Sequence, residues 1–264
     1  MRAVLIKTFF RSFFIQGCWN FNRMQNVGFA FGISPVLLKV FEEGEGRSEA
    51  LLRSLELFNT HPYMATAILG VAGGMELTGG GGAGGEGKAI SEMKETLSGP
   101  LAGLGDSFFW ATLKPLFSVT AVISGFMASF MTGFVGGLVA PIIFLVLYNS
   151  FHLWMRVKGF SVGVRGGSGL IDFLRDLKLP EVTERLTGLI ALLTGVLLAG
   201  LSFFMPSFLN AGDWGLWGNL MFFALIPVIF LYFLVKKGIS IIVVLYVYTL
   251  LCMAGFITLG SYVH

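Results

Sequence analysis

Polar clusters interrupt a chain that is otherwise strongly apolar, and they hold the side chains best suited to bind a small polar ligand. One cluster is Asn59-Thr60-His61, directly before Pro62. Amide, hydroxyl and imidazole groups both donate and accept hydrogen bonds. Between apolar segments such groups need water, protein or a ligand as their partner. We expect a substrate pocket here, with helix capping and local turn bonding as the alternative.

A second cluster, GPLAGLGDS at 99–107, runs into an aromatic stretch that ends at Trp110. Its glycines permit tight turns and close approach of the backbone to a ligand. The carboxylate of Asp106 can accept two sugar hydroxyls, and Trp110 can stack on a pyranose face. In the alternative interpretation, Asp106 and Ser107 cap a helix whose first turn is 107–110, and the two roles are compatible.

A third cluster, QGCWNFNRMQN at 16–26, is rich in amides. Gln and Asn side chains suit neutral polyols, and they suit equally the joining of membrane helices. We predict no catalytic residue, metal site or cofactor. Residues 82–88 match the glycine and lysine positions of a phosphate-binding loop, but Ala89 stands where Ser or Thr is needed and a buried strand is missing upstream. We therefore expect 79–87 to be a flexible loop.

The surroundings of these clusters predict a membrane protein. Of the 264 residues, 55% are hydrophobic and 12% charged, about half the charged fraction usual for a soluble domain. Mean hydropathy is +0.80. A net charge of +3 without a basic aromatic patch argues against a nucleic-acid partner. Cys18 and Cys252 show no metal or disulfide spacing and are expected to be free thiols.

We predict an all-α integral membrane protein with N-terminal amphipathic and re-entrant helices followed by about five spans. Three regions are expected: amphipathic helices in 1–60, a re-entrant region with polar breaks in 61–115, and a transmembrane region in 116–264. Residues 1–17 suggest a basic helix on the membrane surface. Segment 47–58 places three leucines on one helix face, whereas 63–77 is too short to cross with certainty. The leucines are Leu51, Leu52 and Leu55.

The basic residues flanking the apolar runs predict the topology, because Lys and Arg are costly at mid-bilayer. All of them fall on one side when the spans alternate, which predicts a cytoplasmic N-terminus, an external C-terminus and a cytoplasmic segment at 159–185 containing a mixed-charge helix. The flanking residues are Lys114, Arg156, Lys158, Arg185, Lys236 and Lys237. The spans are expected at 116–132, 134–154, 186–206, 218–235 and 239–259.

The same clusters carry a resemblance to a known family. QGCWNFNRMQ, FNTHPY followed by ILGVAGGME, and LSGPLAGLGDSFFWATLKP resemble, in order and spacing, segments of the IID subunit of mannose/fructose/sorbose-class sugar phosphotransferase permeases. The later VAPIIFLVLYN and LMFFALIPVIFLYFLVKKG resemble membrane segments of that family. The resemblance covers most of residues 11–240.

The resemblance implies a subunit of a phosphoenolpyruvate-dependent transport system in the bacterial inner membrane, not an enzyme on its own. It implies a IIC membrane partner with which the chain binds and translocates a mannose-type hexose, assembly of IIC–IID pairs into a higher-order oligomer, and cytoplasmic IIB and IIA phosphocarriers. It brings three groups of residues into the functional region: Trp19, Asn20 and Gln25; Asn59 and Thr60; and Gly103, Asp106 and Trp110. The alternative is a non-transporting membrane scaffold or receptor subunit that retains the fold.

Overall fold

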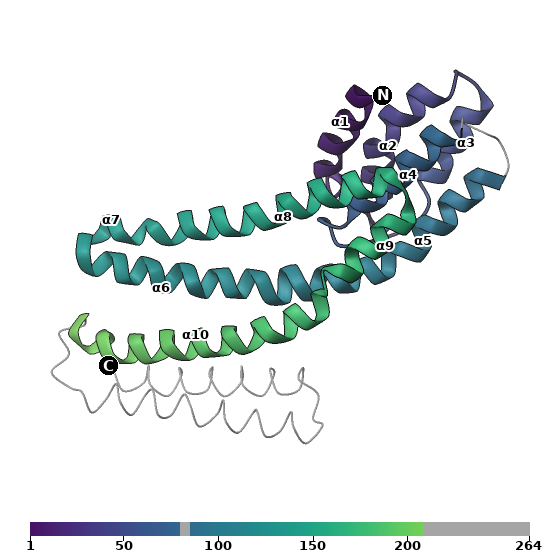
Figure 1. The fold of residues 1–264 in the computed structure, drawn as a ribbon. Helices are drawn as coiled ribbons and strands as arrows, with labels where there is room; N and C mark the ends of the chain where they lie inside the picture. The colour runs from purple at the N-terminus through teal and green to yellow at the C-terminus, as the bar shows by residue number, and fades with distance from the viewer. Residues whose placement is uncertain (80–84, 209–264) are drawn as a thin grey trace, which may run out of the picture. The chain divides into compact units, whose positions relative to one another are not determined.

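The computed structural model describes residues 1–79 and 85–208, whose regular secondary structure is helical (Figure 1). The chain divides into two compact units, Met1–Gly195 and Val196–His264, and all three polar clusters belong to the first. The spans predicted at 218–235 and 239–259 lie outside the described residues. The elements are α1 (Arg2–Arg11), η1 (Ser12–Phe14), α2 (Asn26–Val40), α3 (Glu45–Ser54), α4 (Ala65–Thr78), α5 (Gly85–Gly105), η2 (Asp106–Leu113), α6 (Lys114–Thr132), α7 (Phe134–Gly137), α8 (Val139–Arg165), α9 (Gly167–Asp176) and α10 (Leu179–Phe208).

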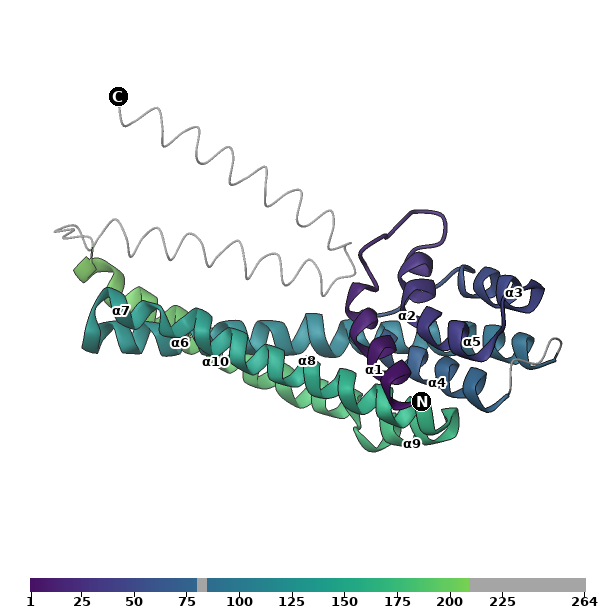
Figure 2. The same cartoon turned by 90° about the horizontal axis from the view of Figure 1, so that it is seen from above.

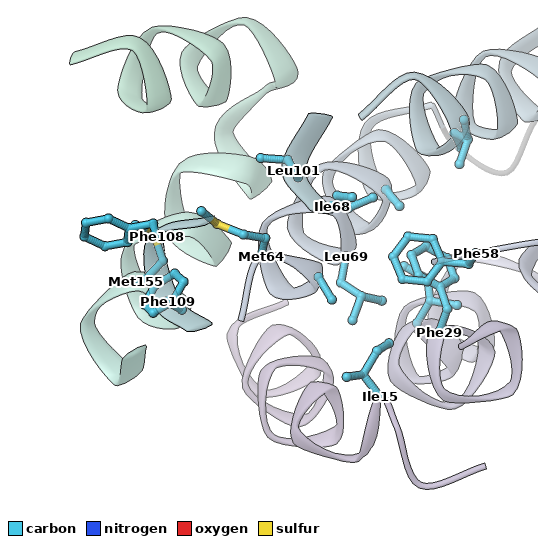
Figure 3. Packing of buried hydrophobic residues seen from close by; sticks show 14 of the residues in the cluster. Ile15, Phe29, Phe58, Met64, Ile68, Leu69, Leu101, Phe108, Phe109 and Met155 are labelled. Atoms are coloured by element: carbon cyan, nitrogen blue, oxygen red, sulfur yellow. The ribbon is translucent and has the colours of Figure 1, made fainter. Parts of the chain in front are cut away.

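Helix α4 is the centre of the core of the first unit. Apart from Glu76 its residues are apolar or small on every face, and Ile68 and Leu69 are fully buried. Figure 3 shows the rings of Phe29 and Phe58 lying together on one side of this helix, with their centroids 4.6 Å apart. A helix that is apolar all round is a buried one, which explains why 63–77 carries an apolar signal too short for a span.

Glycines allow α4 to pack closely against the last turns of α8, the most extensive helix contact in the unit. A Cβ added at Gly163 would lie 2.5 Å from the carbonyl oxygen of Ala67, and one at Gly70 would lie 2.6 Å from that of Phe160. Side chains at these positions would force the two backbones apart. The segment predicted at 159–185 does not begin as a separate element, because 159–165 continues α8. The mixed-charge stretch, predicted as one helix, divides between α9 and α10.

Helices α6 and α8 run side by side as a long hairpin in both views (Figures 1 and 2). Gly133 makes the turn at its tip with φ +63°, a left-handed conformation that favours glycine. Two continuous helical stretches of the described chain, Gly87–Thr132 and Phe134–Arg165, are long and apolar enough to cross a membrane. Large apolar side chains such as Met131 and Ile142 are exposed on the hairpin. The helices predicted at 116–132 and 134–154 are present, and 186–206 falls within α10.

Two sequence predictions about local structure are corrected. Helix α3 buries Ala50 and Ser54, and Leu51 packs against the core while Leu52 is exposed, so the packed face contains only part of the predicted leucine face. The polar break expected at 99–107 is absent from the described chain, because α5 contains Pro100 and passes directly into η2. The π-helix η2 starts at Asp106 without a break in the helical run, and its cap position is Gly105, so neither Asp106 nor Ser107 caps a helix. Buried Leu101 and Phe109 on either side of the junction hold the helix in the core.

Candidate functional site

The amide-rich cluster at 16–26 and the cluster at 59–61 are joined by the side chain of Gln25. Its Nε2 donates to the carbonyl oxygen of Thr60 at 2.8 Å, and the backbone N–H of Thr60 donates to Gln25 Oε1 at 3.2 Å. The backbone N–H of Gln25 also donates to the carbonyl oxygen of Phe58 at 2.8 Å. An extended segment has no helical partners for its backbone groups, so an amide with both donor and acceptor satisfies them.

The asparagines near this junction play different parts. Asn20 Nδ2 donates to Asn26 Oδ1 at 2.8 Å, and Asn26 Nδ2 donates to the carbonyl oxygen of Leu55 at 2.8 Å. These bonds fasten the amide-rich loop to the end of α3. Trp19 is exposed and packs edge-on against Phe21 at a centroid distance of 4.9 Å. The amide-rich cluster therefore combines a buried, bonded part with an exposed aromatic part.

His61 brings the 59–61 cluster against the junction of α5 and η2. Its ring stacks on that of Phe109, with centroids 5.2 Å apart and planes 15° from parallel, and it meets Trp110 at 4.8 Å. Gly105 makes this approach possible, because a Cβ there would lie 2.3 Å from His61 Cβ. The backbone N–H of Tyr63 donates to His61 Nδ1 at 3.3 Å. Local turn bonding is thus confirmed for His61, whereas the cap position of α4 is Met64.

The predicted site residues fall into a buried group and an exposed group. Gln25, Thr60 and His61 are buried. Asn59, Gly103 and Asp106 are exposed, and Trp110 is 47% exposed. A Cβ added at Gly99 or Gly103 would have no atom within 4 Å, so the backbone of α5 is open to a ligand or a partner there. The buried group supports the turn, and the exposed group offers a carboxylate, an amide and an indole.

Helix η2 is a π-helix, which sets where these exposed groups lie. Thr112 Oγ1 donates to the carbonyl oxygen of Ser107 at 2.8 Å, and the backbone N–H of Lys114 donates to that of Phe109. The backbone bond closes an i→i+5 turn, and the hydroxyl of Thr112 spans the same five-residue spacing. Short π segments within longer helices are rare and occur frequently at functional sites. Asp106 and Trp110 both stand on this segment.

A face of α8 that sequence reasoning missed completes the surroundings of His61. The ring of His152 stacks on that of Tyr63 at 4.4 Å, and Tyr63 lies 6.1 Å from Tyr148. Arg156 is 4% exposed, and its guanidinium lies 5.2 Å from the centre of the Tyr63 ring. The sequence treats Arg156 as an interfacial flank, but the structure packs it inside. The missed signal is the four-residue spacing of Phe144, Tyr148, His152 and Arg156, which places them on one helix face.

The buried polar atoms of this region are incompletely satisfied. Thr60 Oγ1 and His61 Nε2 are buried with no hydrogen-bond partner among the described residues. Burial, and to a lesser degree the positive charge of Arg156, lowers the pKa of His61 from 6.5 to about 4. The imidazole is therefore neutral at physiological pH, and its unpaired nitrogen belongs to a ring that contacts the half-exposed Trp110. A neutral ring can accept or donate one hydrogen bond there, according to its tautomer.

The fold and this site define an all-helical membrane protein. The family model described as "PTS system mannose/fructose/sorbose family IID component" matches residues 1–259. This chain belongs to that family of IID components of the phosphotransferase system.

Curated relatives of known specificity share the matched region. The fructose permease IID component of Bacillus subtilis is 35% identical over 68% of this chain. The mannose-specific EIID component of Escherichia coli K12 is 38% identical over 64%, and the sorbose-specific EIID component of Klebsiella pneumoniae is 30% identical over 74%. The match spans 62%, 56% and 68% of these relatives, respectively, and therefore less than two thirds of the first two.

Solved structures agree with this family. The cryo-EM structure of the mannose transporter ManYZ in complex with microcin E492 is similar with a TM-score of 0.55 and 28% identity, over 98% of this chain and 97% of that one. A second chain, described as a membrane protein, gives a TM-score of 0.64 at 26% identity over the same shares. The predicted IID family and all-α membrane fold are confirmed.

Proposed function

We propose that this chain binds and translocates a mannose-type hexose together with a IIC membrane subunit, within a phosphoenolpyruvate-dependent permease of the bacterial inner membrane. Cytoplasmic IIB and IIA carriers supply the phosphoryl group, and IIC–IID pairs form a larger oligomer. The N-terminus is cytoplasmic and the C-terminus external. The names of the fructose, mannose and sorbose relatives support a hexose, and the identity of 38% to a mannose-specific component favours that class.

The observation that carries this proposal is the contact of His61 with the Phe109–Trp110 pair, at 5.2 and 4.8 Å. This contact fixes the 59–61 segment beside a helix surface on which Asp106 is exposed and Trp110 half-exposed. A carboxylate accepts hydrogen bonds from two neighbouring sugar hydroxyls, and an indole face packs on the C–H face of a pyranose ring. Asn59 adds an amide that both donates and accepts.

The buried and exposed residues have separate roles in this proposal. Asp106, Trp110 and Asn59 contact the sugar or the IIC surface that encloses it, and Gly103 lets that contact reach the helix backbone. Gln25, Thr60 and His61 hold the turn in place. Trp19 and Asn20 belong to the surface that meets the partner. Phosphoryl transfer is the task of the soluble carriers, and this chain contributes the path and its selectivity.

Uptake measurements with single variants test the proposal. Asp106→Asn keeps the size of the side chain but weakens its hydrogen bonds to hydroxyls, and Asn59→Ala removes an amide. Asp106→Asn is expected to reduce uptake of labelled mannose by at least about tenfold, the value of one charge-assisted hydrogen bond, and Asn59→Ala by up to about tenfold, the value of one neutral hydrogen bond. Membrane insertion should be unchanged in both. The matched control is Asp172→Asn, an exposed carboxylate on α9 paired with Arg175. Normal uptake in both test variants contradicts the proposed role and favours a scaffold that does not transport.

A further inference from the structure

A groove of about 640 Å³ lies between α1 and the last turns of α8, away from the polar clusters. The two helices meet through the rings of Phe9 and Phe160, whose centroids are 5.5 Å apart, and Figure 1 shows α1 beside the end of α8. Apolar side chains from both helices line most of it, among them Leu5, Phe9, Val157 and Phe160. Its size is typical of sites for small ligands.

The polar lining of this groove is cationic. Arg2 and Arg165 both line it, together with the hydroxyl of Ser161. Both arginines are exposed, and neither takes part in an ion pair among the residues that the structure describes. Guanidinium groups bind phosphate oxygens in two-point geometry, and a serine hydroxyl can donate a further hydrogen bond. An apolar wall joined to two unpaired guanidinium groups fits an amphiphile with an anionic head.

The position of the groove along α8 matches the depth of lipid headgroups. At 1.5 Å per residue, a helix that enters the hydrocarbon near Val139 crosses a layer of about 30 Å in about 20 residues, near Lys158. Val157 then lies at the boundary, and Arg165 lies about 10 Å beyond it, on the headgroup side. The proposed topology places this end of α8 at the cytoplasmic leaflet, which carries the anionic lipids.

We propose that this groove binds an anionic phospholipid, with the phosphate held between Arg2 and Arg165 and an acyl chain along the Phe9–Phe160 wall. The lipid then fastens the N-terminal helix to the end of α8. This inference requires a membrane location and does not depend on which sugar the chain carries, so failure of the uptake test leaves it standing.

The test uses the full chain in its membrane complex, purified in neutral detergent. The midpoint of thermal unfolding is followed while phosphatidylglycerol, phosphatidylcholine or glycerol 1-phosphate is added. Phosphatidylglycerol is expected to raise the midpoint, and the double variant Arg2→Gln with Arg165→Gln is expected to bind it at least about tenfold more weakly. Val157→Ser tests the apolar wall without changing charge and is also expected to weaken binding.

The control variant, Lys7→Gln with Arg185→Gln, removes the same charge from exposed residues outside the groove. It is expected to retain binding within about twofold, because distant surface charges are screened. Equal weakening in this control would show general surface electrostatics and overturn the site. An equal rise in the midpoint with phosphatidylcholine would also overturn the site, because binding would not require a net negative charge. An equal rise with glycerol 1-phosphate would overturn it too, because binding would not require an acyl chain.

Discussion

Gln25 and Thr60, 35 residues apart, form a two-point hydrogen-bonded pair in which a side-chain amide takes the place of a neighbouring strand. Both bonds are buried, so loss of the amide leaves a backbone donor and a backbone acceptor without partners. This pair, with the backbone bond from Gln25 to Phe58, links the amide-rich loop to the turn that carries His61. Its integrity controls where Asn59 and His61 stand relative to η2.

Gln25→Ala should therefore reduce the free energy of unfolding by about 1–3 kcal/mol, because it leaves buried backbone groups without hydrogen-bond partners. The measurement is the unfolding of the purified protein in detergent. Gln16→Ala is the matched control, because Gln16 belongs to the same loop and is exposed. A loss of equal size in both variants would contradict the special role of Gln25.

A pair of glycine substitutions two residues apart tests the contact of His61 with α5. Gly105→Ala places a Cβ 2.3 Å from His61 Cβ and should destabilise by about 1–3 kcal/mol through overpacking. Gly103→Ala meets open space, so it should be neutral or stabilise the helix by up to about 1 kcal/mol. Thermal midpoints of the two variants distinguish these effects. Similar midpoints would show that the turn can move away from the helix at little cost.

The neutral state of His61 predicts a loss of stability in acid. Its pKa is about 4 in the folded protein and 6.5 without the fold, so between these values the unfolded chain binds more protons. Stability is fully present above pH 6.5, falls as the pH is lowered towards 4, and does not change further below that. The total contribution is about 3 kcal/mol. His61→Phe should flatten the profile in this window, while carboxylate effects remain common to both proteins. An unchanged slope would mean that the ring is not buried in its neutral form.

The ion pair between Arg53 and Glu76 joins α3 to α4, with Nη2 and Oε1 2.7 Å apart. The Glu76 side chain is 5% exposed and that of Arg53 is 19% exposed. Glu76→Gln leaves a guanidinium without its counter-ion and should cost about 3 kcal/mol, the lower end for buried pairs. Glu92→Gln, which breaks the exposed pair with Lys88, should change stability by less than about 1 kcal/mol. Chemical unfolding of both variants provides the comparison, and equal effects would place the Arg53 pair among ordinary surface pairs.

Much of this fold could be predicted from local sequence signals. The apolar runs at 116–132 and 134–154 are helices, and the polar residues before Pro62 form a break between α3 and α4. Both signals are local, because the length of an apolar run and the restricted backbone of a proline constrain the segment in which they occur. The convergence of the polar clusters was suggested only by family resemblance, since pairs such as Gln25 and Thr60 depend on tertiary contacts.

Other features depend on tertiary packing, which local sequence patterns do not indicate. Gly99 and Pro100 indicate a break, yet buried Leu101 and Phe109 keep the helix continuous. Arg156 resembles an interfacial flank, but the carbonyl oxygen of Ser12 at 3.5 Å and the Phe13 ring at 4.6 Å enclose its guanidinium. Charge patterns alone cannot distinguish a cation that meets headgroups from one that meets aromatic rings.

The π-helix at Asp106–Leu113 has a geometric consequence for the whole rod from α5 to α6. Because its turns hold more residues than those of an α-helix, it shifts the angular phase of everything that follows. The open surface at Gly103 and the outward side chains of α6 are thereby oriented independently within one uninterrupted rod. If the same residues took the ordinary α-helical pitch instead, each would turn through 360°/3.6, or about 100°, and α6 would be rotated against α5 relative to its present orientation. The π-helix thus sets the angle between the open surface of α5 at Gly103 and the outward apolar side chains of α6.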